Sequence, residues 1–272
     1  AWDQPFTNAF GLSLSATYYE IEVRNTIIEP SGQFIINDCY ESPTGNSVFC
    51  DRIDRDLSDP TQPFIDFIDQ GFLNRDSEAA RGVDINLAFD DTWTVFNRPI
   101  DFSSDIVANR QLERSTLFVS EELVPDAQTF SGEWGFPEWR VQAFFRFDYD
   151  DFRLTWETRY TGSVHQKEAE VDPFSDAFTF SDTCLGPPDD VLCRDYADTG
   201  NYFIHNISMY YYGDRWTFGG GIRNLLDEEP PFVDTDTVGA PLAVNNTPLG
   251  YGYDLNGRTY FFNVAVNFGG GQ

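Results

Sequence analysis

The sequence predicts an all-β chain that forms a transmembrane antiparallel β-barrel, and three observations support this fold class. Apolar and polar residues alternate along several short segments of the chain. The connections between these segments are alternately long and short. No apolar run in the 272 residues approaches the roughly 20 residues that a transmembrane helix needs. Barrel strands do not need such a run, because only every second side chain faces lipid.

The last segment of the chain shows the alternation most clearly. One face carries only apolar residues: Tyr260, Phe262, Val264, Val266 and Phe268. The other face carries Thr259, Asn263, Ala265 and Asn267, interrupted only by Phe261. Because successive side chains of a strand point to opposite faces, this pattern suits lipid on one side and a polar lumen on the other.

The same alternation recurs in seven further segments, which gives about eight strands in all. These segments are residues 10–25, 83–89, 100–119, 141–149, 152–160, 201–212 and 216–223. In the first of them the phase of the alternation changes between Tyr18 and Tyr19. Such a change is expected where a strand leaves the bilayer or contains a bulge.

The lengths of the connections favour a membrane barrel over a soluble β-sandwich. The long connections are residues 26–79, 120–138, 165–200 and 227–256. The short ones are residues 92–99, 148–151 and 213–214. Outer-membrane barrels have long extracellular loops and short periplasmic turns, whereas a sandwich has no reason to alternate in this way.

The charge of the chain excludes one class of function and leaves another open. The net charge is −28 and Lys167 is the one lysine, so nucleic-acid binding through a basic patch is excluded. Aspartates concentrate in the connections 26–79 and 165–200. They suit hard cations such as calcium or bridges to lipopolysaccharide, or they form a solvated acidic surface. The short fragment from Asp234 to Asp236 does not decide between these readings.

Four cysteines predict disulfide bonds. Cys39 and Cys50 lie in one polar connection, and Cys184 and Cys193 lie in another. There is no C-x-x-C motif and both histidines are distant in sequence, so zinc binding is disfavoured and no metal site is assigned. We expect the local pairs Cys39–Cys50 and Cys184–Cys193, which require an oxidising compartment.

No motif of a known enzyme class occurs, and we predict that the chain is not an enzyme. It has neither G-x-S-x-G nor H-E-x-x-H. His165 is expected in a polar loop. His205 lies in an apolar phase among aromatic residues, so we expect it to mark a membrane boundary rather than to bind haem.

Two motifs near the end of the chain resemble those of TonB-dependent outer-membrane receptors. The first begins at Gly221, and its matching residues are Asn224, Leu225, Asp227, Pro230 and Pro231. The second matches the ending of the family's barrels through Tyr253, Asp254, Gly257, Arg258 and the late aromatic residue Phe268. Weaker matches include Pro137, Trp139 and Arg140, then Trp156, Arg159, Tyr160 and Gly162.

The resemblance implies a place in a larger assembly. Barrels of this family have roughly 22 strands around a plug domain. Nothing in residues 1–272 matches a plug or a TonB box, so we expect the C-terminal portion of a transmembrane β-barrel domain, with its plug outside this chain. The bacterial outer membrane, with its lipid and lipopolysaccharide, is the implied location. TonB–ExbB–ExbD, acting through the plug, and a surface lipoprotein are implied partners.

The implied activity is energy-coupled import of a scarce ligand: a metal chelate, a cobalamin-like cofactor, a glycan or a peptide. On the predicted lumen face, Arg153, Glu157, Arg159 and Arg223 could pair with one another or with a plug, or contact the ligand. Near an outside loop, Trp134 and Trp139 could stack on a sugar or an aromatic chelate, or mark the membrane interface. No cofactor is expected beyond calcium at the acidic loops.

Two other functions are compatible with parts of the pattern. A self-contained eight-stranded barrel could have a structural or adhesion role, since eight strands can close around their own side chains. A secreted β-sandwich could bind carbohydrate through its aromatic residues. The sandwich requires a polar outer face, whereas here the apolar face of each strand is the one rich in aromatic residues.

Overall fold

The computed structural model describes most of the chain. The described residues are 2–3, 10–41, 47, 49–58, 64–119, 125–165, 198–231, 233, 243–244, 247–248 and 250–268. Their long strands are β2 (Phe10–Ile28), β5 (Leu73–Val95), β6 (Arg98–Val119), β8 (Trp139–Tyr149), β9 (Phe152–Thr161), β10 (Tyr202–Tyr212), β11 (Trp216–Arg223) and β14 (Thr259–Val266). The shorter elements are β1 (Trp2–Asp3), α1 (Gly32–Glu41), the 3-10 helix η1 (Cys50–Arg52), β3 (Ile53–Asp56), β4 (Phe64–Ile68), β7 (Pro125–Thr129), β12 (Ala243–Val244) and β13 (Thr247–Pro248).

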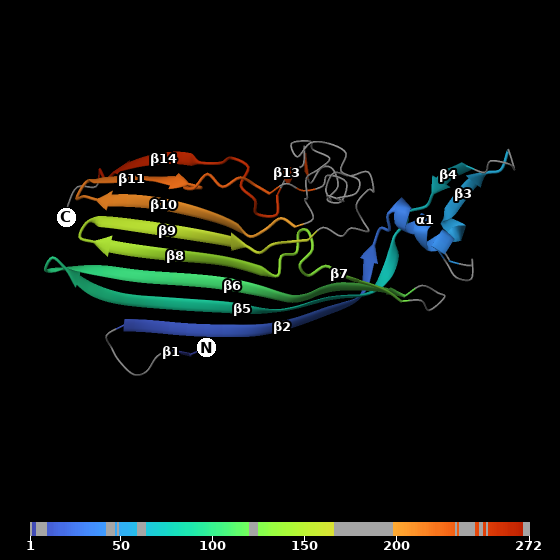
Figure 1. The fold of residues 1–272 in the computed structure, drawn as a ribbon, viewed down its shortest axis with the longest axis horizontal. Coiled ribbons are helices and arrows are strands. Elements are labelled where there is room, and N and C mark those ends of the chain that lie inside the picture. The colour runs from blue at the N-terminus through green and yellow to red at the C-terminus, as the bar shows by residue number, and fades with distance from the viewer. Residues whose placement is uncertain are drawn as a thin grey trace, which may run out of the picture. The chain divides into compact units, whose positions relative to one another are not determined.

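The long strands form a single antiparallel sheet, in which sequence neighbours are also spatial neighbours. The order is β1-β2-β5-β6-β8-β9-β10-β11-β14, with β7 paired to β6 (Figure 1). The register is regular: β9 and β10 pair without a shift from Phe152↔Tyr211 to Thr161↔Tyr202. The eight predicted strands are confirmed, and the meander of neighbouring strands is the topology of a membrane barrel.

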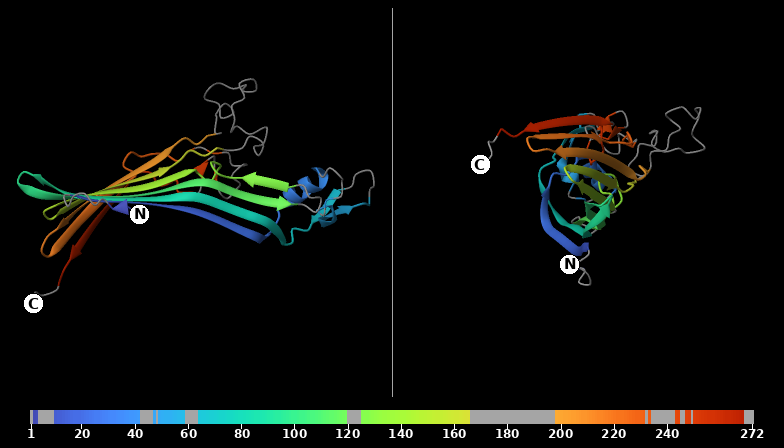
Figure 2. Two further views of the ribbon diagram at one scale, coloured as in Figure 1. Left: turned by 90° about the horizontal axis from the view of Figure 1, so that it is seen from below. Right: turned by 90° about the vertical axis from the view of Figure 1, so that its left-hand side faces the viewer.

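The sheet is a partial barrel. In the described residues its path ends at β1 on one side and at β14 on the other, and these two edges do not pair. Seen end-on, the strands of the main sheet follow an arc from β2 to β14 (right-hand panel of Figure 2). An antiparallel sheet with open edges fits a portion of a larger barrel, because closure would pair the first strand with the last.

The short connections are tight turns, as predicted. Phe96 and Asn97 both have positive φ, 52° and 62°, between β5 and β6. Two successive residues of positive φ make the turn type whose twist matches an antiparallel hairpin. Asp150 also has a positive φ, 49°, between β8 and β9. Each turn reverses the chain within a few residues and keeps the neighbouring strands in register.

The two faces of the sheet have the composition that the alternation predicts. Across one face runs a row of aromatic contacts that joins Phe10, Phe89, Phe102 and Phe147. On the same face of β14, Tyr260 and Phe262 are 72% and 75% exposed. We call this the apolar face. A face with many large exposed apolar side chains is expected of a surface that faces lipid.

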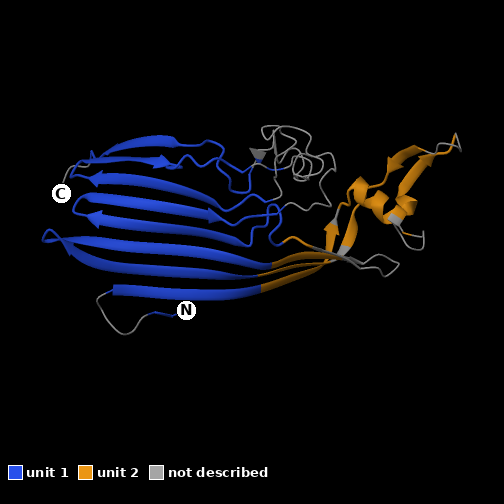
Figure 3. Cartoon of the chain, in the orientation of Figure 1, with its two compact units in different colours: residues 1–19, 82–112, 131–272 blue, residues 20–81, 113–130 orange. Residues whose placement is uncertain are grey.

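The chain divides into two compact units, coloured separately in Figure 3. Unit 1 comprises residues 1–19, 82–112 and 131–272, and unit 2 comprises residues 20–81 and 113–130. The boundary at Tyr19 coincides with the predicted change of phase in the first strand. That strand, predicted over residues 10–25, continues to Ile28.

Unit 2 corrects the prediction that residues 26–79 form a plain loop. This segment contains α1, β3 and β4, and β5 already begins at Leu73. The alternation of apolar residues did not predict the first part of β5, because ion pairs rather than an apolar face join it to the neighbouring strands. Arg81 Nη2 lies 3.1 Å from Glu113 Oε2 and Arg81 Nε lies 3.4 Å from Glu20 Oε1.

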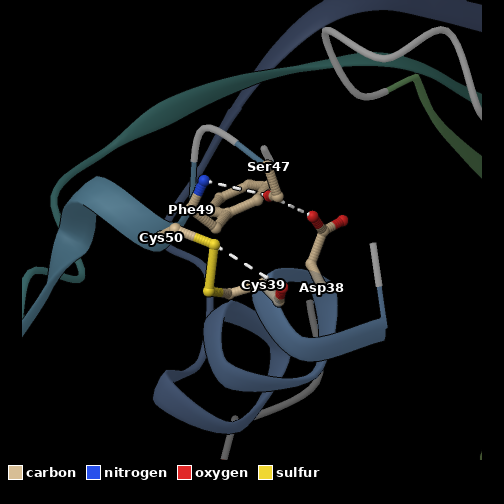
Figure 4. Close-up of a disulfide and its surroundings, with 5 residues drawn as sticks. All are labelled: Asp38, Cys39, Ser47, Phe49 and Cys50. Carbon is tan, nitrogen blue, oxygen red and sulfur yellow. Dashed lines mark hydrogen bonds between the residues drawn. A yellow bond between two sulfur atoms is a disulfide. The ribbon is translucent and has the colours of Figure 1, made fainter. Parts of the chain in front are cut away.

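A small core holds the helical part of unit 2 together. Ile35, Phe49 and Ile53 are buried in it. The predicted disulfide Cys39–Cys50 is confirmed and ties the end of α1 to η1 (Figure 4). Beside it, the Ser47 hydroxyl donates to Asp38 and accepts the N–H of Phe49. Cys184 and Cys193 lie outside the described residues.

In the described part of the chain, no helix has both the length and the apolar character needed to cross a membrane.

Candidate ligand-binding face

The face opposite the apolar face carries a local excess of positive charge. The register places five arginines on it from β8, β9 and β11: Arg140, Arg146, Arg153, Arg159 and Arg223. On the same strands this face carries only two acidic residues, Asp148 and Glu157. The adjacent strand β6 adds Asp101 and Asp105 to this face, so the arginines are concentrated on β8, β9 and β11 within a face that carries both signs of charge. We call it the polar face.

Glu157 is the centre of a hydrogen-bond network on the polar face. Its Oε1 accepts from Gln142 Nε2 at 2.8 Å, and its Oε2 accepts from Asn206 Nδ2 at 2.8 Å. Arg159 Nε lies 3.8 Å from Oε1, so the pair is loose and half-exposed. Asn206 Oδ1 then accepts the backbone N–H of Asn224 at 2.9 Å. The carboxylate therefore ties three strands to the turn after β11.

Arg159 and Arg223 line one cavity of about 510 Å³. The residues after β13 and the start of β14 complete its wall, with Tyr253, Asp254, Asn256 and Phe261 among them. In the described residues Arg223 has no carboxylate within ion-pair distance, and the Arg159–Glu157 pair is long. Both guanidinium groups therefore retain N–H donors for a ligand.

Two neighbouring cavities share residues with this one. A cavity of about 210 Å³ also contains Arg223 and Phe261, together with Glu157 and Asn206. Another, of about 530 Å³, also contains Arg159, together with Gln142 and other residues of β6 and β8. The shared residues make these hollows a continuous row along the polar face.

Glycines in β11 explain why aromatic rings interrupt the polar face. Phe261 lies over Gly221, where an added Cβ would come within 2.6 Å of its ring. Tyr210 lies over Gly219 in the same way. The Arg223 guanidinium is 5.6 Å from the centre of the Phe261 ring, within the range of a cation–π contact. Phe261, which breaks the alternation in the sequence, thus holds Arg223 in the cavity wall.

The structure separates Arg153 from the other predicted ligand-binding residues. Its Nε donates to Asp148 Oδ1 at 2.6 Å, and its guanidinium lies 5.6 Å from the Tyr212 ring. Both neighbours lie close to the short turns. Arg153 thus joins adjacent strands at that end, whereas Glu157, Arg159 and Arg223 share the row of cavities.

The two predicted tryptophans lie in different environments. Trp134 stacks on Tyr253 with ring centres 5.6 Å apart and also contacts buried Val233. This packing covers one face of its indole ring. Trp139 lies at the start of β8, with the Arg110 guanidinium 5.4 Å from its ring. It lines a separate cavity on the apolar side of the sheet.

The two sequence motifs contact each other. Asn224 is fully buried with a φ of 49°; its Nδ2 donates to the carbonyl of Glu228, and its Oδ1 accepts the N–H of Glu228. Asp227 Oδ1 accepts the N–H of Arg258 at 2.7 Å, and Arg258 Nε donates to the carbonyl of Leu225 at 3.0 Å. Gly257, with a φ of 63°, lets the second motif approach Asp227.

The other motif residues support this contact or lie beyond it. The N–H of Asp254 donates to the Tyr202 hydroxyl, and burial raises the pKa of the Tyr253 phenol. Pro230 and Pro231 end the first motif, in a segment that is neither helix nor strand. Phe268 is 93% exposed beyond the end of β14. Asp254 also lines the cavity of Arg159 and Arg223.

Sequence reasoning did not name Gln142, Asn206 and Phe261 as ligand-binding candidates. The alternation had placed Gln142 and Phe261 on the lumen face, and the register adds Asn206 to it. Within the described ranges no group of three or more His, Cys, Asp or Glu is arranged to hold a metal ion. Many of the acidic residues of connection 165–200, including Asp189 and Asp190, lie outside those ranges, so calcium binding there stays a prediction.

The model of the family described as "TonB dependent receptor-like, beta-barrel" matches residues 2–225. The chain belongs to this family. TonB-dependent receptors are outer-membrane proteins that act as transporters and receptors rather than enzymes. The match ends inside the first of the two motifs and does not include the second.

Solved structures of TonB-dependent receptors resemble the chain in fold. The ferric enterobactin receptor from Pseudomonas aeruginosa, in a mutant form in complex with enterobactin, is 13% identical with a TM-score of 0.50. The match covers 96% of this chain and 29% of the receptor. A second mutant of that receptor is 13% identical with a TM-score of 0.49, and the match again covers 96% of this chain and 29% of the receptor. The ferric-catecholate import receptor Fiu from E. coli K12 is 12% identical with a TM-score of 0.31. That match covers 97% of this chain and 40% of the receptor.

The likeness with a TM-score of 0.50 concerns the fold alone, because an identity of 13% carries no information about the ligand. The chain spans less than a third of the Pseudomonas aeruginosa receptor. No curated protein matches the sequence.

Proposed function

We propose that this chain forms part of the barrel of a TonB-dependent active transporter in the bacterial outer membrane. Membership of the receptor family supports this function. The division of the sheet into an exposed aromatic face and a polar face also supports it, since a membrane barrel needs lipid outside and a polar lumen inside. In this arrangement the ligand passes along the polar face.

The observation that carries the proposal is the row of cavities around Arg159 and Arg223. Both arginines lie on the lumen side and retain free N–H donors, and the wall between them holds an aromatic ring, Phe261. Arginine binds the oxygens of carboxylates and phosphates through two parallel hydrogen bonds. The ligand is therefore one that presents anionic oxygens: a metal chelate, a cobalamin-like cofactor, or an acidic glycan or peptide.

Transport by this route needs partners outside the chain. Import against a gradient requires energy, which TonB–ExbB–ExbD would deliver through a plug domain. Such a plug would lie against the polar face, and the arginines that do not contact ligand would contact it. A surface lipoprotein at the long loops is a further proposed partner, and lipid and lipopolysaccharide would surround the apolar face.

Two alternative functions fit the structure less well. A self-contained eight-stranded barrel requires its first and last long strands to pair. In the described residues β2 pairs with β1 and β5, and β14 pairs with β11. A secreted β-sandwich requires a second sheet over the apolar side chains. The two other sheets of the described residues have two strands each, and the apolar face of the main sheet is exposed.

The test is uptake by cells that carry the native full-length polypeptide containing this sequence. Labelled ferric siderophores, cobalamin, acidic oligosaccharides and peptides serve as probes. We expect one class to be taken up only when TonB is present and the proton gradient is intact. Arg159→Ala and Arg223→Ala should each lower that uptake about tenfold or more, since a charged hydrogen bond contributes about 1.5–3 kcal/mol.

Arg153→Ala is the matched control, because it removes an arginine of the same face that is paired with Asp148 at the short-turn end. It should leave uptake within about twofold, since a half-exposed ion pair contributes little. Uptake that persists without TonB would contradict the proposed activity. Equal losses in all three variants would contradict the assignment of the cavity.

A further inference from the structure

A separate cavity of about 320 Å³ lies at the end of β8 and β9 that is far from the short turns. Its lining contains two aromatic rings, Trp139 and Tyr160, and Gly162 between them. The other lining residues are Gly132, Glu138, Ser163, His165, Asp198 and Asn201. Its volume is near the lower limit of small-molecule pockets, which is about 300 Å³, and suits one or two rings of a ligand.

The register shows which face the cavity lies on. Arg140 pairs with Thr161 and Thr161 pairs with Tyr202, so Trp139, Gly162 and Asn201 form the next row across three neighbouring segments. The N–H of Gly162 donates to the carbonyl of Trp139 and confirms that row. Side chains of this row share the phase of Tyr160 and Phe203, and therefore the apolar face. The cavity is thus on the side opposite Arg159 and Arg223.

Gly162 creates the hollow. A Cβ at this position would lie 3.2 Å from the carbonyl oxygen of Trp139 and 3.5 Å from its Cβ. The absence of a side chain in the middle of the row leaves an indole ring on one side and a carboxamide on the other. The Arg110 guanidinium, 5.4 Å from the Trp139 ring, holds the indole in place.

Hydrogen bonds hold the polar groups of the cavity in position. Some of their donors and acceptors remain free for a ligand. Asn201 Oδ1 accepts from the Tyr160 hydroxyl at 2.8 Å and from the N–H of Ser163 at 3.3 Å, so its Nδ2 remains as a donor. Asp198 Oδ1 accepts from the Ser163 hydroxyl and from the N–H of Gly200, which leaves Oδ2 as an acceptor. The Glu138 carboxylate has no partner among the described residues and is a second acceptor.

Two carboxylate acceptors, one amide donor and two aromatic rings match the surface of a sugar. Each sugar hydroxyl both donates and accepts, and the ring has an apolar face that packs on an aromatic side chain. A metal ion fits poorly, since the described residues contain no group of three ligating side chains. A simple cation would leave the Asn201 amide donor unmatched.

We propose that this cavity binds a sugar ring in the headgroup of a membrane glycolipid. We assign the sugar to a lipid because the cavity continues the apolar face, where Phe203 is exposed beside Tyr160. The proposal rests on the membrane placement of the barrel but not on the transported ligand. The glycolipid would brace the loop end of β8, β9 and β10 from outside the barrel.

The test measures glycolipid retained by the full-length protein purified from outer membranes into detergent. Native mass spectrometry counts bound lipopolysaccharide and phosphatidylethanolamine per protein. We expect Trp139→Ala and Asn201→Ala to lower retained lipopolysaccharide about tenfold, since truncating an anchor residue of a site typically costs more than a factor of five to ten. Glu138→Gln, which preserves shape, should lower it less. Trp216→Ala is the control, as it removes an exposed tryptophan of the same face at the short-turn end.

A second arm uses protein in nanodiscs of phosphatidylethanolamine and phosphatidylglycerol, titrated with lipid-free core oligosaccharide. Weaker binding of the oligosaccharide than of intact lipopolysaccharide supports the proposal that the bound sugar belongs to a lipid. Equal binding overturns that part of the proposal. Lipopolysaccharide retention that is unchanged in Trp139→Ala and Asn201→Ala overturns the site. Loss of phosphatidylethanolamine in its place also overturns it. Asn201→Ala should leave TonB-dependent uptake intact, so failure here is distinct from failure of the transport proposal.

Discussion

Replacing Asn224 with alanine is expected to lower the free energy of unfolding of the barrel by about 3 kcal/mol. The side chain is fully buried and makes two hydrogen bonds to the backbone of Glu228, at 2.9 and 2.8 Å. Alanine would leave that N–H and that carbonyl without a partner, at a cost of about 1 kcal/mol each where water can partly reach them. The φ of 49° adds about 1 kcal/mol, because asparagine tolerates this conformation better than alanine.

A glycine at the same position separates the two contributions. Asn224→Gly loses the same hydrogen bonds but adopts a positive φ without strain, so it should be more stable than Asn224→Ala by about 1 kcal/mol. Leu226→Ala is the control, since this neighbouring side chain is 62% exposed and its removal should change stability by less than about 0.5 kcal/mol.

The assay is urea unfolding of the full-length protein in detergent micelles, followed by tryptophan fluorescence, with heat-modifiable electrophoretic mobility as a second probe. The midpoint should fall in the order wild type, Asn224→Gly, Asn224→Ala. An Asn224→Ala variant with the wild-type midpoint would refute the role of the buried amide. A glycine variant less stable than the alanine variant would refute the backbone argument.

Three further predictions concern other parts of the chain. Cys39→Ser should destabilise unit 2 by about 3 kcal/mol, because the disulfide closes a loop with a sequence separation of 11 residues; hydrogen exchange should accelerate in α1, and dithiothreitol should change the wild type but not the variant. Glu157→Gln should lower the urea midpoint by the equivalent of about 1–3 kcal/mol, because one of the two amide donors that face the carboxylate would meet another N–H group; a midpoint unchanged from wild type would contradict the network. The Ser163 hydroxyl and the N–H of Gly200 hold the pKa of Asp198 below its usual range. The stability that the Asp198 carboxylate contributes is therefore present above the unfolded pKa of about 3.9 and is lost as pH falls through the folded value. Hydrogen exchange of the Gly200 amide should accelerate in acid, and Asp198→Asn should abolish this pH dependence.

The strands were predictable from the sequence because each residue of a strand must suit either lipid or lumen, whatever lies on the neighbouring strands. A strand between lipid and lumen must place apolar side chains on every second position, and β14 and β9 show this directly. The short turns were predictable for a similar reason, because a reversal within a few residues is a local property. The phase change at Tyr19 marked the end of the alternating part, although not the end of the strand.

The rest depends on contacts between distant segments. Within unit 2, neighbouring strand segments are joined by ion pairs such as Arg81 with Glu113, which leave no periodic apolar signal. Phe261 seemed to break the pattern because its partner, Gly221, lies on the neighbouring strand and is distant in sequence. The cavity of Arg159 also needs Asp254 from a late connection. No local pattern places these residues side by side.

The residues of the two sequence motifs are therefore different from those that would decide the ligand. Asn224, Asp227 and Arg258 form hydrogen bonds with backbone groups of one another's segments, so they stabilise the local fold of this chain. Arg159 and Arg223 have few partners of their own, and other residues could replace them without loss of the fold. Exchanging these two positions between receptors should change ligand preference while leaving the urea midpoint nearly unchanged, whereas exchanging the motif residues should do the reverse.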